Sequence, residues 1–314
     1  MTRYLIFLSY IGTRYRGIQK LTLKQKLQDT DTIQGALELA LMTVPGCTNN
    51  PVFSTSSRTD AGVHALCNSG HVDLTNKYNK VYEPVSLRDW LNRYFKNCSH
   101  EIRILSCIPV MPDYHSRYNA AHRTYIYRLL VPKDNCEKTL PVNEIDRCYL
   151  LKSSNFDVDK ARSVLHLFQG RRDYKTFTRI LSNDTRIKFV RKLEQLTIEE
   201  GRPLLPEDPH ATNFHYWNIV CSAKGFLYNQ VRRIVASLIA VGQGLLTEKD
   251  VYVMLTVPST SNWNTRASTA PSCGLFLTKV HYDPENLRKN TLSESLEAQF
   301  CLNREKKKKN ISVS

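Results

Sequence analysis

Apolar and polar residues repeat along the chain with two different periods. Two-residue alternation and short apolar runs predict strands at residues 4–10, 71–75, 102–110, 124–129, 193–199, 214–223 and 274–282. Helical spacing of apolar residues predicts helices at residues 33–44, 85–95, 156–168 and 226–243. Strands and helices are interspersed without a regular βαβ rhythm, a GxGxxG motif or a P-loop. We therefore expect an α+β fold whose two halves both contain sheet.

The periodic pattern is interrupted at two places. The proline-containing stretch VMPDYHS near residues 110–115 predicts a boundary between an N-terminal lobe, 1–112, and a C-terminal lobe, 113–284. Beyond the second lobe the chain becomes polar and contains REKKKKN near its end. This composition predicts a basic disordered tail over 285–314, either a solvated terminus or a nonspecific RNA arm or nuclear signal.

Composition narrows the class of protein. The 314 residues include 44 Lys and Arg against 29 Asp and Glu, a formal net charge of +15, and 41% are apolar. Enough apolar surface for a core rules out wholesale disorder, and no apolar run approaches the ~18 residues that span a bilayer. We expect a soluble protein without a membrane partner. The excess of cations favours nucleic acid as a partner, although a basic housekeeping surface has the same composition.

Cysteine usage and the N-terminus bear on the compartment. The nine cysteines contain no CxxC pair and predict free thiols in a reducing compartment, and the nine histidines form no zinc-ligand pattern. The strand-like YLIFLSY follows Met1-Thr2-Arg3 directly, so neither a secretion signal nor a long cleaved presequence is predicted. Cytosol, nucleus and a mitochondrial route without a long transit peptide stay open.

The segment SSRTDAGVHA, residues 56–65, is the densest candidate for chemistry. Its small residues allow a ligand to approach the acid Asp60, which is flanked by Arg58 and His64. The planar cation of Arg58 suits a phosphate or a base. A helix N-terminus capped by Asp60 explains the same residues equally well.

The predicted helix FLYNQVRRIVASLIAVGQG, residues 226–244, has one buried apolar stripe. At about 100° per residue, Arg232 lies beside this stripe, whereas Arg233 points nearly opposite Val231. A semi-buried Arg232 needs an acceptor such as Asp60, unless its side chain extends from the helix edge to solvent.

A third segment, YHSRYNAAHRTYIYRL at 114–129, interleaves tyrosines with Arg and His. Such mixtures suit stacking on unpaired bases beside phosphates. An ordinary strand with Tyr125 and Tyr127 in the core fits the pattern as well.

Together these segments resemble the TruA-type tRNA pseudouridine synthase family, from about residue 4 to 282 and with the order of motifs kept. SSRTDAGVHA is similar to the RTDxGVHA loop, which puts Asp60 at the catalytic aspartate. HRTYIYRL is similar to the RRYRY strand, with Tyr125 at the uracil-stacking tyrosine, and FLYNQVRRIVASLIAVGQG to FxxxMVRxIVGxLxxVGxG, with Arg232 at the arginine that pairs with the aspartate. YIGTRYRGIQ, TIQGALE, YHSRYNA and APSCGLFL also resemble the family's YxGxxYxGWQ, TVQxxLE, FHARFSA and APAxGLxL.

The resemblance implies a two-lobed pseudouridine synthase fold, with a central mixed, largely antiparallel sheet and flanking helices around an RNA cleft. It implies isomerisation of uridine to pseudouridine in RNA, above all in the anticodon stem-loop of tRNA, by a homodimer that uses no cofactor and no metal. Asp60 is then catalytic, and Tyr125, Arg58 and Arg232 bind the substrate. The residues of these motifs are most similar to those of the eukaryotic synthase-like branch, whose members are associated with mitochondria. We therefore expect a mitochondrial or cytoplasmic protein.

Three departures from the family pattern concern substrate choice more than chemistry. Ile18 replaces a tryptophan, Thr124 an arginine, and Gln230 an apolar residue. Two other functions stay open. One is an RNA-binding protein of the same fold without turnover. The other is an enzyme on a different substrate, such as a phosphate-ester hydrolase, for which paired metal-binding acids are missing from the motifs.

Overall fold

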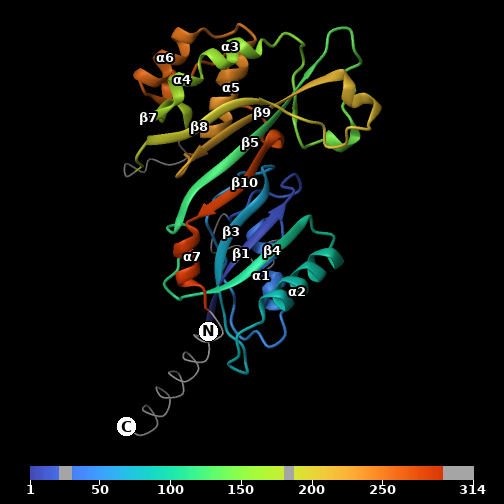
Figure 1. Cartoon of the computed structure of the whole chain (residues 1–314), viewed down its shortest axis with the longest axis vertical. Coiled ribbons are helices and arrows are strands. Elements are labelled where there is room, and N and C mark those ends of the chain that lie inside the picture. The colour runs from blue at the N-terminus through green and yellow to red at the C-terminus, as the bar shows by residue number, and fades with distance from the viewer. Residues whose placement is uncertain (21–29, 180–186, 293–314) are drawn as a thin grey trace.

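One mixed β-sheet of ten described strands runs through the molecule (Figure 1). The computed structural model describes residues 1–20, 30–179 and 187–292. Along the sheet the strands follow the order β4-β1-β3-β10-β5-β9-β8-β7, with β2 beside β3 and β6 beside β5. The strands are β1 Thr2–Tyr10, β2 Ser54–Thr55, β3 His64–Leu74, β4 Ile102–Val110, β5 Ala120–Pro132, β6 Tyr149–Leu150, β7 Gly170–Asp173, β8 Val190–Glu200, β9 Phe214–Ala223 and β10 Leu275–Tyr282.

Helices cover the two ends of this sheet (Figure 1). Two lie at the end that carries β4, β1 and β3: α1 Ile33–Met42 and α2 Pro84–Asn97. Four lie together at the end that carries β9, β8 and β7: α3 Val158–Ser163, α4 Leu165–Phe168, α5 Gln230–Gly242 and α6 Glu248–Thr256. Short 3₁₀ turns are η1 Val142–Glu144, η2 Lys175–Phe177, η3 Pro209–Asn213, η4 Thr260–Asn262 and η5 Ser272–Gly274. The predicted α+β class is confirmed. None of the described helices is long and apolar enough to cross a membrane.

Strand β10 joins the two halves of the sheet. It runs parallel to β3, with Leu277 opposite Ala65, and antiparallel to β5, with Leu277 opposite Tyr125. Because β3 begins at His64, the loop that precedes this strand ends two strands away from Tyr125. The fold thus brings together two of the segments that the motifs single out.

The predicted helix at 226–243 begins later than expected. Asn229 has a φ of 59°, which is left-handed backbone, so regular helix starts only at Gln230. The extended turn before it contains Phe226 and Tyr228, which line the cleft described below.

The predicted disordered tail does not begin at residue 285. Helix α7, Pro284–Asn290, starts there because Asp283 caps it by accepting a hydrogen bond from the backbone N–H of Glu285. Leu287 of this helix packs on a buried cluster of Leu5, Val110 and Tyr114. The chain then pairs with β4 through the bridge between Val110 and Thr291. The rest of the predicted tail, 293–314, lies outside the described residues, and the division at residue 112 stays a prediction.

The eight cysteines among the described residues are all free thiols, as predicted. Cys301 lies outside the described residues.

Candidate active site

A cleft of about 950 Å³ opens between the loop that precedes β3, the start of β5, the β7–β8 edge and the turn before α5. All four residues predicted from the sequence line it: Arg58, Asp60, Tyr125 and Arg232. They come from three segments that are far apart along the chain. The cleft is therefore the place where the three motif segments meet.

The loop that carries Asp60 is a turn between two strands. The backbone N–H of Val63 donates to the carbonyl of Asp60 over 3.1 Å, and Gly62 takes a φ of 76°, which suits glycine. The chain then enters β3 and not a helix. The alternative in which Asp60 caps a helix is therefore wrong, and its carboxylate remains available to a ligand.

Buried polar contacts fix the position of this loop. Thr59 bonds to the hydroxyl of Tyr10 over 2.7 Å, and the amide of Asn68 donates to both Tyr10 and the carbonyl of Ser57. Burial raises the pKa of Tyr10, so its hydroxyl stays protonated. Because Thr59, Tyr10 and Asn68 are all buried, each contact is made in a low dielectric and fixes the loop geometry.

His64 fixes the other end of the loop. Its Nδ1 accepts a hydrogen bond from the backbone N–H of Gly12 over 2.9 Å, so Nε2 is the protonated nitrogen that donates to the carbonyl of Cys273 over 3.0 Å. The ring stacks on Phe276 at 4.5 Å, and burial lowers the pKa of His64. A neutral imidazole with both nitrogens occupied is a structural clamp.

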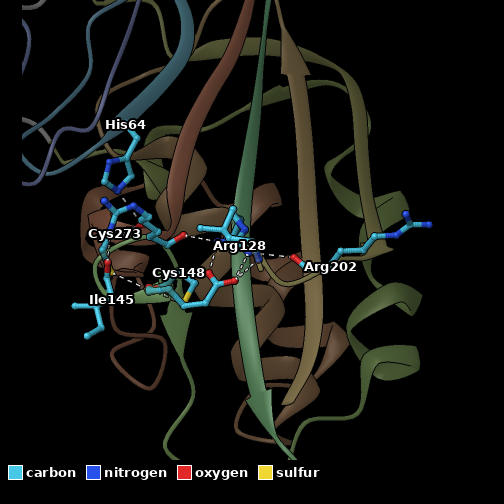
Figure 2. Close-up of polar contacts among 9 residues, drawn as sticks. His64, Arg128, Ile145, Cys148, Arg202 and Cys273 are labelled. Carbon is cyan, nitrogen blue, oxygen red and sulfur yellow. Dashed lines mark hydrogen bonds and ion pairs between the residues drawn. The ribbon is translucent and has the colours of Figure 1, made fainter. Parts of the chain in front are cut away.

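The His64 clamp continues into a polar network behind the cleft (Figure 2). The thiol of Cys273 donates to the carbonyl of Cys148 over 3.2 Å, and the thiol of Cys148 donates to the carbonyl of Glu144 over 3.3 Å. Glu144 in turn holds Arg128 of β5 through two charge-assisted hydrogen bonds. The Asp60 loop is thereby connected to strand β5.

Arg232 lies at the first turn of α5 and faces Asp60. Its Nη1 is 4.0 Å from Oδ2 of Asp60. Its Nε donates to the carbonyl of Ala270 over 2.6 Å, and its Nη1 to the side chain of Asn229 over 3.2 Å. With these contacts the side chain does not extend to solvent, so the alternative of an arginine at the helix edge is wrong.

The charge of Asp60 is set by two opposing effects. Its side chain is 28% exposed, and burial raises its pKa more than the cation of Arg232 lowers it. An arginine that pairs with an aspartate, as the family resemblance implies for Arg232, favours the ionised carboxylate. The arginine acts in the expected direction, but at 4.0 Å it offsets only part of the desolvation.

Tyr125 forms the inner wall of the cleft. It is 6% exposed, its hydroxyl lies 3.0 Å from Oγ of Ser57, and its ring meets the edge of Phe226 at 5.2 Å. Burial raises the pKa of Tyr125 to about 12, so it is a neutral phenol at physiological pH. The ring belongs to the core and also lines the cleft, so the core interpretation holds and the stacking role stays a prediction.

Known proteins match both halves of the chain. Residues 164–283 match the family model described as tRNA pseudouridine synthase. A protein named tRNA pseudouridine synthase-like 1 from Xenopus laevis is 31% identical over 96% of this chain and 98% of its own length. Its namesake from Homo sapiens is 33% identical over 89% and 90%, and tRNA pseudouridine synthase A from Agrobacterium fabrum is 27% identical over 90% and 93%.

The chain belongs to the tRNA pseudouridine synthase family. The resemblance inferred from the motifs is thereby confirmed. The roles of the individual site residues stay predictions, because the matches concern the chain as a whole.

Among these family motifs, Arg58 occupies the most open position. Its side chain is exposed, it lines the cleft, and it makes no hydrogen bond or ion pair with the rest of the described chain. Because its guanidinium group has no partner in the described chain, it can bind a phosphate or a base.

Arg123 was missed as a site residue. It is 7% exposed and donates to three backbone carbonyls, those of Ser56 at 2.9 Å, Arg117 at 3.1 Å and Lys224 at 2.6 Å. These carbonyls lie on three different walls of the cleft, so one side chain fixes the walls relative to each other. Burial lowers the pKa of Arg123. A signal for it was available in the sequence. Arg123 stands two residues before Tyr125 in one strand, and such residues point to the same face of the sheet.

Arg233 does not point freely away from the protein, as the helical spacing suggested. It donates to the carbonyls of Thr176 and Thr178 and lies over the ring of Trp263 at 4.7 Å. The prediction from helical spacing assumed that only one side of the helix is packed against the protein. In the structure, η2 and the turn around Trp263 cover the second side of α5.

The described lining of the cleft is strongly basic. Eight cationic residues face two acids, Asp60 and Glu194; the cations are Arg58, Arg117, Arg123, Arg171, Arg191, Lys192, Lys224 and Arg232. A concave surface of one sign focuses its field and attracts a polyanion. Across the described ranges, no three His, Cys, Asp or Glu side chains are grouped so that they could hold a metal ion.

Proposed function

We propose that this protein isomerises uridine to pseudouridine in tRNA, with the anticodon stem-loop as the modified region. One observation carries the proposal. In a member of the tRNA pseudouridine synthase family, the acid of the RTDAGVHA loop lies 4.0 Å from the arginine of α5 and shares a basic cleft with Tyr125.

The proposed reaction needs only side chains. The N1–C1′ bond of uridine breaks, the uracil turns within the cleft, and a C5–C1′ bond forms. C5 loses its proton and N1 gains one, so no oxidant, reductant or cofactor is consumed. Asp60 supplies the carboxylate that stabilises the separated sugar and base, through a bond or through its charge.

The other three residues hold the substrate. The target nucleotide must leave its stack, and Arg58, which is exposed and unpaired among the described residues, fills the vacated space. Tyr125 packs against the uracil near C5, and Arg232 favours the ionised form of Asp60. The exposed cations of the lining, among them Arg117, Arg171 and Lys192, neutralise backbone phosphates.

We further propose that the active form is a homodimer and that it works in mitochondria or the cytoplasm. Light scattering after size-exclusion chromatography measures the first. Pseudouridine mapping in fractionated cells with and without the protein measures the second.

The decisive experiment is a pseudouridine-specific chemical assay on unmodified tRNA incubated with the purified chain. We expect pseudouridine in the anticodon stem-loop with the parental protein and none with Asp60→Asn. Tight binding of tRNA without any pseudouridine would contradict turnover and establish the alternative of an RNA-binding protein of the same fold.

A further inference from the structure

A largely exposed tyrosine ring lies at the rim of the cleft. Tyr118, on the segment between β4 and β5, is 76% exposed and lines the same cavity as Asp60. Tyr125 in the same cavity is 6% exposed. Tyr228, which also lines the cleft, is 38% exposed, so Tyr118 is the most exposed of the three tyrosines there.

The rim ring is held in place by its own segment. It lies against His115, with ring centroids 4.3 Å apart and planes at 37°. The backbone N–H of Asn119 donates to the carbonyl of His115, and that of Arg117 donates to Nδ1 of His115. Arg123 holds the carbonyl of Arg117 from inside. Presentation of the ring thus costs little additional ordering when a ligand binds.

Exposed cations line the same cleft as this ring. Arg117 and Arg58 are both exposed and both line the cleft. An exposed aromatic face in one cleft with exposed guanidinium groups is suited to a nucleotide, whose base stacks while its phosphate is neutralised. Tyr252 on α6 is a useful contrast, because it is 55% exposed but does not line the cleft.

We propose that Tyr118 is a second base-stacking site, which receives the unpaired base next to the flipped uridine, with Arg117 at the phosphate between them. The inference rests on the proposed function and deepens it. Extrusion of one nucleotide removes stacking from its neighbour, at a cost of a few kcal/mol. A preformed ring outside the inner pocket restores that stacking and thereby selects targets whose neighbouring base is unpaired.

The test compares Tyr118→Ala, Tyr118→Leu and Tyr118→Phe, with Tyr252→Ala as a matched exposed control. For a tRNA stem-loop substrate, we expect KM and Kd to rise about 5- to 100-fold in the Ala and Leu variants, the range typical of one base–aromatic stack. The Phe variant and Tyr252→Ala keep parental values, and kcat stays within about twofold in all four. Because Tyr118 is 76% exposed, none of these changes removes a core contact.

A fluorescent base locates the contact. With 2-aminopurine beside the target uridine, binding to the parental protein quenches the emission by stacking, and binding to Tyr118→Leu at saturating protein does not. Unchanged quenching and Kd in the Ala and Leu variants, with the parental protein active, would overturn the inference, as would an equal loss in Tyr252→Ala. Absence of pseudouridine with the parental protein would instead refute the proposed function.

Discussion

Two arginine–carboxylate pairs of this protein are built differently. Arg128 and Glu144 approach to 2.5 Å, and the glutamate side chain is 1% exposed. Arg232 and Asp60 stay 4.0 Å apart, and the aspartate side chain is 28% exposed.

The first pair is saturated, whereas the second is not. Both oxygens of Glu144 accept from Arg128, one also accepts from the backbone N–H of Leu204, and Arg128 reaches the carbonyls of Arg147 and Arg202. Within the described part of the chain, the carboxylate of Asp60 has no hydrogen bond, and Arg232 spends two donors on Ala270 and Asn229. A saturated pair stabilises a fold, while an undersaturated pair keeps lone pairs free for a substrate.

The largest expected difference is in turnover. Asp60→Asn should lower the rate of pseudouridine formation at least ~1,000-fold, because the proposed reaction loses its carboxylate. Stability should be equal or slightly higher at neutral pH. The folded pKa of Asp60 is raised, so its ionised form costs free energy above that pKa, and the amide removes this cost.

Two measurements check this prediction, single-turnover kinetics and urea unfolding at several pH values. The stability gain of Asp60→Asn should vanish as pH falls below the unfolded pKa of an aspartate. An Asn variant that turned over RNA at the parental rate would remove Asp60 from the chemistry.

The saturated pair should show the opposite behaviour. Arg128→Met leaves Glu144 buried without its partner and should lower the free energy of unfolding by about 3–5 kcal/mol, with little change in kcat per folded molecule. Exchange of both residues for methionine should recover most of the loss, since no buried charge remains. Denaturant titrations of the two variants measure the difference, and an Arg128→Met protein as stable as the parental protein would contradict the contrast between the pairs.

The pair of Asp60 and Arg232 can also be broken by replacing the arginine. Arg232→Leu should lower kcat about 100-fold, as loss of one charge-stabilising donor commonly does. It should also shift the acid limb of the pH–rate profile to higher pH, because the cation that lowers the pKa of Asp60 is gone. Arg232→Lys serves as the control that keeps the charge. An acid limb that did not move in Arg232→Leu would show that the two side chains are uncoupled.

The smallest effect concerns the segment beyond α7. Affinity for tRNA should fall log-linearly with salt, because each neutralised phosphate releases counterions. Deletion of residues 293–314, which include Lys306 to Lys309, should make the slope shallower and leave turnover at saturating RNA unchanged, since no proposed site residue lies there. The deletion spares α7 and the Val110–Thr291 bridge. Loss of turnover in a folded deletion variant would show that the removed segment belongs to the active complex.

Local patterns predicted the strands well. Residues 102–110 and 214–223 were predicted as strands and coincide with β4 and β9, since alternation or a short apolar run records burial directly. Helix α6 was missed although Thr247 and Asp250 form a capping box, a signal that spacing of apolar residues does not contain.

Partner choice was harder to predict than element type. The motifs singled out Asp60 and Arg232. They did not predict that Arg232 would also donate to the carbonyl of Ala270, nor that its guanidinium group would lie 4.0 Å from the carboxylate of Asp60. Nor did they predict that Arg233 lies over the ring of Trp263. Such contacts depend on which loop covers which helix face, and that is settled by packing between segments more than 20 residues apart.

The position of β10 has a consequence for the protein during its synthesis. Strand pairing joins the two halves of the sheet only through this strand within the described residues, and β10 lies after residue 274. A nascent chain can pair β1, β3 and β4, and later β5, β8 and β9, but β10, the strand between β3 and β5, leaves the ribosome after all of these. Asp60 and Tyr125 thus acquire their final spacing only after β10 has been synthesised. The order of synthesis keeps an unfinished chain from presenting an assembled cleft to RNA, and it makes closure of the sheet a contact between segments more than 200 residues apart, which folds slowly.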